Sequence, residues 1–204
     1  IPSVQYINVD SQKSLIISET SMPEISADEC LLNVKAIGVN RADLLQRDGK
    51  YPPPAGESNI LGLEVSGKIV QCGELSGVNP SGKPWREGDN VFGLVAGGGY
   101  AQFVKVKTAQ LFPLPKDFTF EQGAACAEVF LTAYQSLFTI AALKPKAKVL
   151  IHAGASGVGS AAIQLAKIMQ CYVVVTVGSE EKAQACLALG ADVAINYQNT
   201  DFHC

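Results

Sequence analysis

Residues 150–167, LIHAGASGVGSAAIQLAK, combine residue types and spacing that could bind a phosphate. An apolar run meets a turn containing Gly154, Ser156, Gly157 and Gly159, and an amphipathic pattern follows. Glycines between a strand and a helix permit a tight turn and let a pyrophosphate approach the helix N-terminus. The turn predicts a dinucleotide site, although Ser156 replaces the middle glycine of the strict G-x-G-x-x-G pattern. A glycine-rich connection without a ligand is the alternative.

A second chemical signal lies at the tip of the following apolar run, in the segment TVGSEEK. A site for NAD usually has Asp or Glu here, because a carboxylate binds the ribose 2′-hydroxyl. Gly178, Ser179 and Lys182 instead supply space, a hydroxyl and a cation, which suit a 2′-phosphate and favour NADPH. Lys182 falls near the positive end of its helix dipole and therefore needs an anion nearby. A solvated Lys182, balanced by Glu180 and Glu181, is the alternative.

Three strands and two helices are expected to position these groups. Their ranges in chain order are 147–153, 156–170, 171–177, 179–190 and 192–197. The apolar face expected on the first helix consists of Val158, Ala161, Ala162, Leu165, Ala166 and Met169. Ser179 is the expected N-cap of the second helix and Gly190 its end. Alternating strands and helices predict a parallel sheet. Tyr197, at the end of its third strand, could cover an adenosine or donate to a phosphate.

Residues 1 to about 125 predict β structure interrupted by turns, since short β-favouring runs alternate with Gly and Pro clusters. The clearest runs are ECLLNVKAIGV (29–39), EVSGKIVQC (64–72), DNVFGLV (89–95) and AQFVKVK (101–107). Residues 120–143 then show spacing closer to that of a helix. We therefore expect an α/β protein with a β domain over 1–125 and a dinucleotide-binding domain over 126–204.

The composition excludes several classes of protein. A net charge of −3 gives no reason to expect nucleic acid or an anionic membrane as a partner. The sequence contains no signal-peptide pattern and no run long enough to span a bilayer. Six cysteines without CxxC pairs indicate reduced thiols and a cytoplasmic location. Because only His152 and His203 are available, a three-ligand zinc site or a Ser-His-Asp triad is hard to assemble. His152 is expected to be a core histidine with its hydrogen bonds satisfied.

Most of residues 30–202 resemble the medium-chain dehydrogenase/reductase superfamily, in particular its zinc-independent, zeta-crystallin-like quinone oxidoreductases. The motifs are GVNRADLLQRDGKYPPP (38–54), NILGLEVSGKI (59–69), WREGDNVFGL (85–94), GGGYAQFVKV (97–106), FLTAYQSL (130–137) and HAGASGVGSAAIQLAK (152–167). The resemblance implies a GroES-like β domain followed by a Rossmann domain, with NADPH and a small-molecule substrate in the cleft between them. It also implies a homodimer that reduces quinones or related electron-poor alkenes; an enoyl or alkenal reductase is the alternative.

The zinc alcohol dehydrogenases of the same superfamily differ from this chain at their metal ligands. Asn40 stands where they have Cys, Leu63 where they have His, and Glu128 at or near their second Cys, with Cys126 slightly displaced. The resemblance therefore implies a site without metal, in which Glu64 pairs with a buried donor. Hydride transfer to a quinone needs less Lewis-acid help than alcohol oxidation does, because the ring delocalises the incoming charge.

The resemblance also implies roles for individual residues. Asn40, Asp43 and Tyr51 would line the cleft, with Tyr51 donating a hydrogen bond or proton to the developing quinol oxygen. Tyr51 packed on its prolines, and Asn40 and Asp43 holding their loop, are the alternatives. The expected cofactor-binding residues are Thr132, Gly154, Ala155, Ser156, Gly157, Val158, Gly159, Gly178, Ser179, Lys182 and Tyr197.

The last residues, DFHC, depart from the resemblance after Phe202. A dinucleotide fold has two β-α-β-α-β halves, and only the first is expected here. We therefore expect a truncated isoform, an incomplete gene product or a fragment, with Val193 and Ile195 uncovered at an unpaired sheet edge. Two classes of function follow: an NADPH-dependent quinone reductase, or a non-catalytic chain that is unstable or associates with a full-length partner.

Overall fold

A computed structural model of the chain describes residues 3–199. The chain divides into two compact units, Ile1–Glu128 and Val129–Cys204. The boundary expected from the sequence, at 125/126, falls between two short helices. The segment DFHC and the last five residues of the expected second domain lie outside the described residues.

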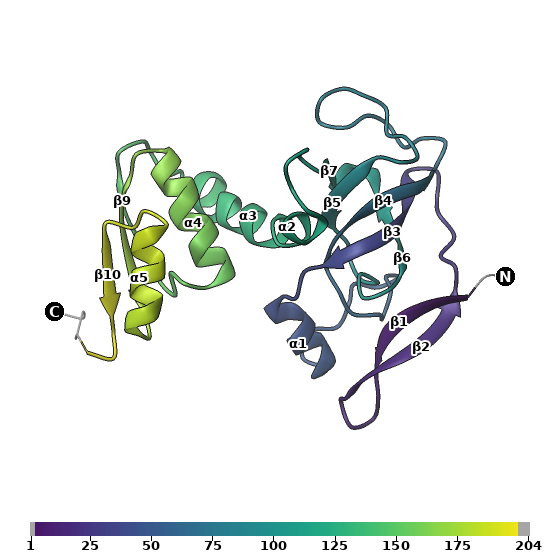
Figure 1. Ribbon diagram of the computed structural model, residues 1–204, viewed down its shortest axis with the longest axis horizontal. Coiled ribbons are helices and arrows are strands. Elements are labelled where there is room, and N and C mark those ends of the chain that lie inside the picture. Colours follow the sequence, from purple (N-terminus) through teal and green to yellow (C-terminus); the bar gives the residue numbers. More distant parts are fainter. Residues whose placement is uncertain (1–2, 200–204) are drawn as a thin grey trace. The chain divides into compact units, whose positions relative to one another are not determined.

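The first unit contains an antiparallel five-stranded sheet with the strand order β6-β3-β4-β5-β7 (Figure 1). Its strands are β3 (Glu29–Ile37), β4 (Glu64–Cys72), β5 (Asn90–Leu94), β6 (Phe103–Lys107) and β7 (Leu111–Pro113), with a 3₁₀ turn, η1 (Thr108–Gln110), before β7. All four β-favouring runs form strands, as predicted. Alternate side chains face one core, which includes Cys30, Leu32, Val65, Ile69, Trp85, Val91, Val104 and Leu111.

Two features of the first unit were not predicted. A separate antiparallel hairpin joins β1 (Ser3–Val9) to β2 (Leu15–Ser21). A seven-residue helix, α1 (Arg41–Arg47), follows β3 in a segment that the sequence analysis assigned to β structure and turns. Asp43 and Arg47 stabilise its first and last turns through the helix dipole.

The helical pattern over residues 120–143 forms three short pieces. These are α2 (Phe120–Ala124), α3 (Ala127–Tyr134) and a π-helical segment, η2 (Gln135–Ile140). The Thr119 side chain caps α2 by accepting from Gln122 N. The helical spacing is thus confirmed, although the helical path is interrupted at Ala125 and Cys126.

The second unit is the predicted β-α-β-α-β arrangement. Its elements are β8 (Lys148–Ile151), α4 (Gly157–Ile168), β9 (Tyr172–Val177), α5 (Glu180–Ala188) and β10 (Val193–Asn196). The three strands are parallel in the order β10-β9-β8. Within residues 3–199, β8 and β10 each pair only with β9, and Val193 and Ile195 are half-buried.

The buried face of α4 differs from the predicted one. Ala161, Ala162 and Ala166 are buried as expected, but Val158 is exposed. Ile163 was not assigned to the face, yet it is fully buried against the strands. A helix that contacts neighbours on more than one side buries a wider arc than a single apolar stripe predicts.

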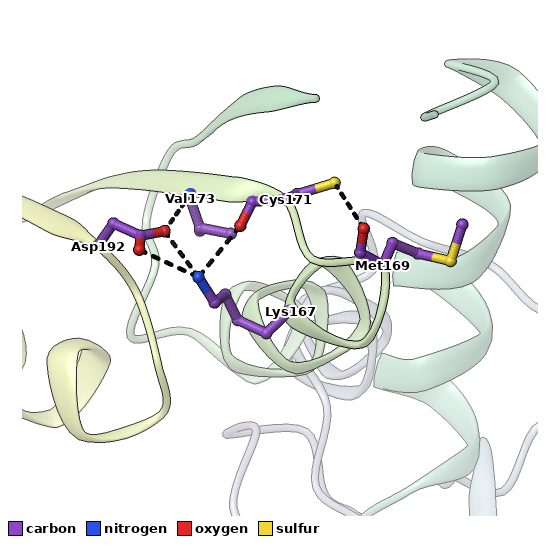
Figure 2. A network of polar contacts seen from close by, with 5 residues as sticks. All are labelled: Lys167, Met169, Cys171, Val173 and Asp192. Atoms are coloured by element: carbon purple, nitrogen blue, oxygen red, sulfur yellow. Dashed lines mark hydrogen bonds and ion pairs between the residues drawn. The ribbon is translucent and has the colours of Figure 1, made fainter. Parts of the chain in front are cut away.

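A polar cluster fixes the end of the sheet opposite the glycine turn (Figure 2). Lys167 Nζ donates to Cys171 O at 3.1 Å and to Asp192 Oδ2 at 2.8 Å. The same Asp192 oxygen accepts from Val173 N at 2.7 Å, so one carboxylate joins the ends of α4, β9 and β10. The Lys167 contact and the Val173 N–H hold the pKa of Asp192 below its usual value.

No helix in residues 3–199 is long and apolar enough to cross a membrane.

Candidate functional site

In the first unit, Glu64 is the centre of a buried polar network. Its Oε2 accepts from Asn40 Nδ2 at 3.0 Å, and its Oε1 accepts from Glu128 N at 3.0 Å. Gly38 is required beside it, because a β-carbon there would overlap Glu64 Oε2 and Ala124 O. Glu64 is only 2 % exposed, and its carboxylate is paired as expected, although its two donors are half-buried. The network holds Asn40 at the start of α1.

Asp43 continues this network from the first turn of α1. Its Oδ2 accepts from Asn40 N at 2.7 Å and from the Tyr100 hydroxyl at 3.0 Å. Its Oδ1 is buried and has no hydrogen-bond partner within residues 3–199. Burial and the Asp43 carboxylate raise the pKa of Tyr100, which therefore stays a neutral donor. Tyr100 was not among the predicted site residues, and the only signal for it in the sequence is its place directly after the GGG segment.

Three acidic side chains and a thiol meet around this network. Burial raises the pKa of Glu64, and burial together with the Asp43 charge raises that of Glu128. Burial and the charge of Glu64 raise the pKa of the Cys126 thiol. This thiol donates to Gln122 O at 3.1 Å, so it is held as a neutral group rather than an activated nucleophile.

The same residues do not form a metal site. Within residues 3–199, no group of three or more His, Cys, Asp or Glu side chains could hold a metal ion. Asn40 turns its amide nitrogen, which is not a ligand, toward Glu64, and Leu63 offers no donor atom. The donor set therefore does not fit a catalytic zinc, which needs three protein ligands.

Tyr51 lies outside this network. It is 49 % exposed in the loop that follows α1, and it makes no hydrogen bond to another described residue. Its hydroxyl is accessible to a ligand, and its proposed donor role stays a prediction.

The glycine turn of the second unit has the backbone of a phosphate cradle. Ser156 caps α4, since its Oγ accepts from Gly159 N at 3.0 Å. A β-carbon at Gly159 would overlap Ala153 O and approach Gly154 O, so this helix start requires glycine. Ala153, with a φ of 52°, makes the left-handed turn before the glycines. The twelve-residue helix α4 therefore begins directly at an exposed turn, where its dipole favours an anion.

The tip of β9 gathers the second set of predicted residues. The Ser179 side chain caps α5 by accepting from Lys182 N at 3.3 Å. The Tyr197 hydroxyl lies against Gly178, where a β-carbon would come within 2.6 Å of it. Lys182 is exposed and forms no ion pair with the described residues. Glu180 Oε1 instead accepts from Gln184 Nε2 at 3.0 Å.

Two other residues of the second unit were assigned from the sequence. Thr132 is exposed on α3, and its cofactor contact stays a prediction. The expectation of a core histidine at 152 is wrong, because His152 is exposed beyond the end of β8. Its Nδ1 shares a 3.0 Å hydrogen bond with Thr176 Oγ1.

Comparison with known proteins agrees with both units. The alcohol dehydrogenase GroES-like domain family matches residues 26–116, and the zinc-binding dehydrogenase family matches residues 157–203. Quinone oxidoreductase 1 of Escherichia coli is 38 % identical over 175 residues, which cover 85 % of this chain and 51 % of that protein. The chain belongs to the medium-chain dehydrogenase/reductase superfamily.

Two further comparisons extend this assignment. The synaptic vesicle membrane protein VAT-1 homolog of Rattus norvegicus is 35 % identical over 180 residues, covering 88 % of this chain and 43 % of that protein. A solved structure of Escherichia coli quinone oxidoreductase complexed with NADPH aligns with a TM-score of 0.79 at 31 % identity, covering 98 % of this chain and 60 % of that one. The GroES-like domain and the Rossmann-type sheet are thus confirmed. The chain spans about half the length of the curated relatives it matches.

Proposed function

We propose that this medium-chain dehydrogenase/reductase binds NADPH and reduces quinones by hydride transfer without zinc. The observation that carries the proposal is that the Lys182 side chain is exposed and is in no ion pair with the described residues. Lys182 is a residue of the first turn of α5, where the helix dipole disfavours a cation. A cation left in this position suits the 2′-phosphate that distinguishes NADPH from NADH. Solved relatives in complex with NADPH support this choice.

The chain's own residues would divide the binding of NADPH between two places. The turn containing Gly154, Ala155, Ser156, Gly157, Val158 and Gly159 would hold the pyrophosphate with backbone N–H groups. Ser179, Lys182 and Tyr197 would contact the 2′-phosphate, with Gly178 leaving room for it, and Thr132 would contact the cofactor as well. When bound, NADPH supplies the hydride.

The first unit would supply positioning and a proton. The Tyr51 hydroxyl is exposed and unpaired among the described residues, so it is available to donate to the quinol oxygen. The hydrogen bonds of Asn40 and Asp43 to Glu64 and Tyr100 would keep α1 and the Tyr51 loop in place. No step needs a Lewis acid, since a quinone delocalises the incoming charge. We expect a homodimer and a cytoplasmic location, as the resemblance and the scattered cysteines suggest.

Direct binding and turnover test separate parts of this proposal. Calorimetric titration with NADPH and NADH tests cofactor choice without requiring catalysis. Cofactor oxidation, followed with a panel of quinones and with one conjugated enone, then tests the reaction. Turnover of quinones supports the reductase, and turnover of the enone alone supports the alkenal reductase. NADPH binding without any turnover supports the non-catalytic chain, since catalysis requires a nicotinamide held in near-attack geometry. Loss of turnover in Tyr51→Phe at unchanged NADPH affinity would identify the proton donor.

A further inference from the structure

Two cysteines of the first unit face one another across neighbouring strands. Cys30 on β3 and Cys72 on β4 are directly opposed in the antiparallel register. Their sulfur atoms lie 3.5 Å apart, and the Cys30 thiol is positioned to donate to Cys72 Sγ. Neither cysteine forms a disulfide in this structure. The proposed NADPH site and the Glu64 network use neither thiol.

The backbone hydrogen bonds define which kind of pair this is. Gly73 N donates to Glu29 O at 2.8 Å, so the residues beside the cysteines form a hydrogen-bonded pair. Pairs alternate along an antiparallel ladder, and Cys30 and Cys72 therefore form a non-hydrogen-bonded pair. In such pairs the Cα atoms are about 4.5 Å apart, and the side chains approach most closely. That separation lies within the range of about 4.4–6.8 Å found in disulfides.

The strand ends around the cysteines are already fixed in position. Leu75 N donates to Ala27 O at 2.8 Å, which continues the strand pairing past Cys72. A β-carbon at Gly73 would overlap Ala27 O, so the backbone segment before β3 and the segment after β4 are in close contact there. The sulfurs, 3.5 Å apart, have about 1.5 Å to close to reach the bonded distance of about 2.05 Å, between strand ends that are already paired.

The two thiols differ in access to solvent. Cys30 is completely buried in the core of the sheet, whereas Cys72 is half-buried at its margin. Burial and the hydrogen bond to Cys72 raise the pKa of Cys30 to about 12, so Cys30 stays protonated. An oxidant from solvent would meet Cys72 first.

We propose that Cys30 and Cys72 are a redox-active dithiol that a low-molecular-weight disulfide oxidises to an intramolecular disulfide. The Cys72 thiolate attacks one sulfur of the oxidant, forming a mixed disulfide and releasing one thiolate. The sulfur released from the oxidant takes up the Cys30 proton, and the resulting Cys30 thiolate attacks Cys72 Sγ, which forms the protein S–S bond and releases the second sulfur of the oxidant as a thiolate. Two protein thiols lose two electrons, and the oxidant becomes two thiols. The bond ties β3 to β4 at the base of the 73–85 loop.

Oxidised glutathione is the probe for the test, applied to the folded 204-residue chain with Cys204→Ser in every variant. After hours of incubation, alkylation in denaturant and peptide mapping are expected to find residues 30 and 72 joined. The Cys126→Ser control should form the same bridge. Cys72→Ser should form none, and Cys30→Ala should accumulate a glutathione adduct at Cys72. Dithiothreitol should reverse the wild-type change.

The melting temperature provides a second readout. The bridged protein is expected to melt about 5 °C higher than the reduced one, because the bond constrains the unfolded chain. Three results would overturn the proposal: free thiols at both positions after oxidation, a glutathione adduct on Cys72 beside a free Cys30, or a bridge that forms only in denaturant.

Discussion

A β-carbon built on Gly178 would lie 2.6 Å from the Tyr197 hydroxyl oxygen. Ordinary contacts of a β-carbon lie at 3.4–4 Å, so any larger residue at Gly178 must push the Tyr197 ring aside. The contact joins the tip of β9 to the end of β10, beside Ser179 and Lys182. Gly178→Ala is therefore expected to weaken NADPH binding about tenfold, or about 1.4 kcal/mol. Titration calorimetry measures this change. The Tyr197→Phe variant is measured beside it, because it removes the hydroxyl of the contact and keeps the ring. An unchanged NADPH affinity in Gly178→Ala would contradict the role assigned to this contact.

Gly159→Ala is expected to disrupt the phosphate turn. Its β-carbon would overlap Ala153 O and approach Gly154 O, which are backbone atoms that cannot rotate away. We expect a loss of about 1–3 kcal/mol in the free energy of unfolding, together with loss of NADPH binding.

Gly157→Ala is the matched control for this variant. Its β-carbon would meet only the Val129 side chain, at 2.8 Å from Cγ1. Urea unfolding of both variants makes the comparison, and equal stability losses would argue against a specific backbone requirement at Gly159.

Stability should depend on pH through Glu64. Burial raises its pKa in the folded protein above the usual value of 4.5. An acid with a raised pKa contributes stability that is fully present below 4.5 and is lost as the pH rises through the raised pKa. The difference in unfolding free energy between wild type and Glu64→Gln should therefore shift against the wild type on going from pH 4 to pH 7. Urea unfolding at a series of pH values measures the difference, and a constant difference would refute the raised pKa.

Much of the second unit could be predicted because its signals are local. The apolar runs, the Ser179 cap and Gly190 each lie within a few residues of the element they define, and the parallel order follows from their alternation. The helix α1 was not predicted, because seven residues are too few for a hydrophobic periodicity that would indicate one buried helix face.

The centre of the first unit could not be predicted in the same way. Tyr100 and Asp43 are separated by 57 residues and meet only when the sheet folds. Asn40 was recognised by resemblance, but its hydrogen-bond partner depends on the position of Glu64 on the folded strand β4.

The exposure of His152, in the second unit, was also not predicted, since β8 ends at Ile151 rather than at residue 153.

Metal analysis tests the proposed zinc independence. Since Asn40 and Leu63 replace two ligands, the purified protein is expected to contain no stoichiometric zinc. Chelators should leave its melting temperature and any turnover unchanged. About one tightly held zinc per chain, measured by elemental analysis, would overturn the assignment of these residues as non-ligands.

The most direct measurement of the central claim compares the affinities of NADPH and NADH for wild type and Lys182→Ala. Wild type is expected to bind NADPH at least about tenfold more tightly, or about 1.4 kcal/mol, because Lys182 is exposed and forms no ion pair with the described residues. Lys182→Ala should lose most of this preference while its NADH affinity stays nearly the same. Lys148→Ala, at an exposed lysine that begins β8, should leave both affinities unchanged. Equal affinities of wild type for the two cofactors, or a preference that survives Lys182→Ala, would contradict the account.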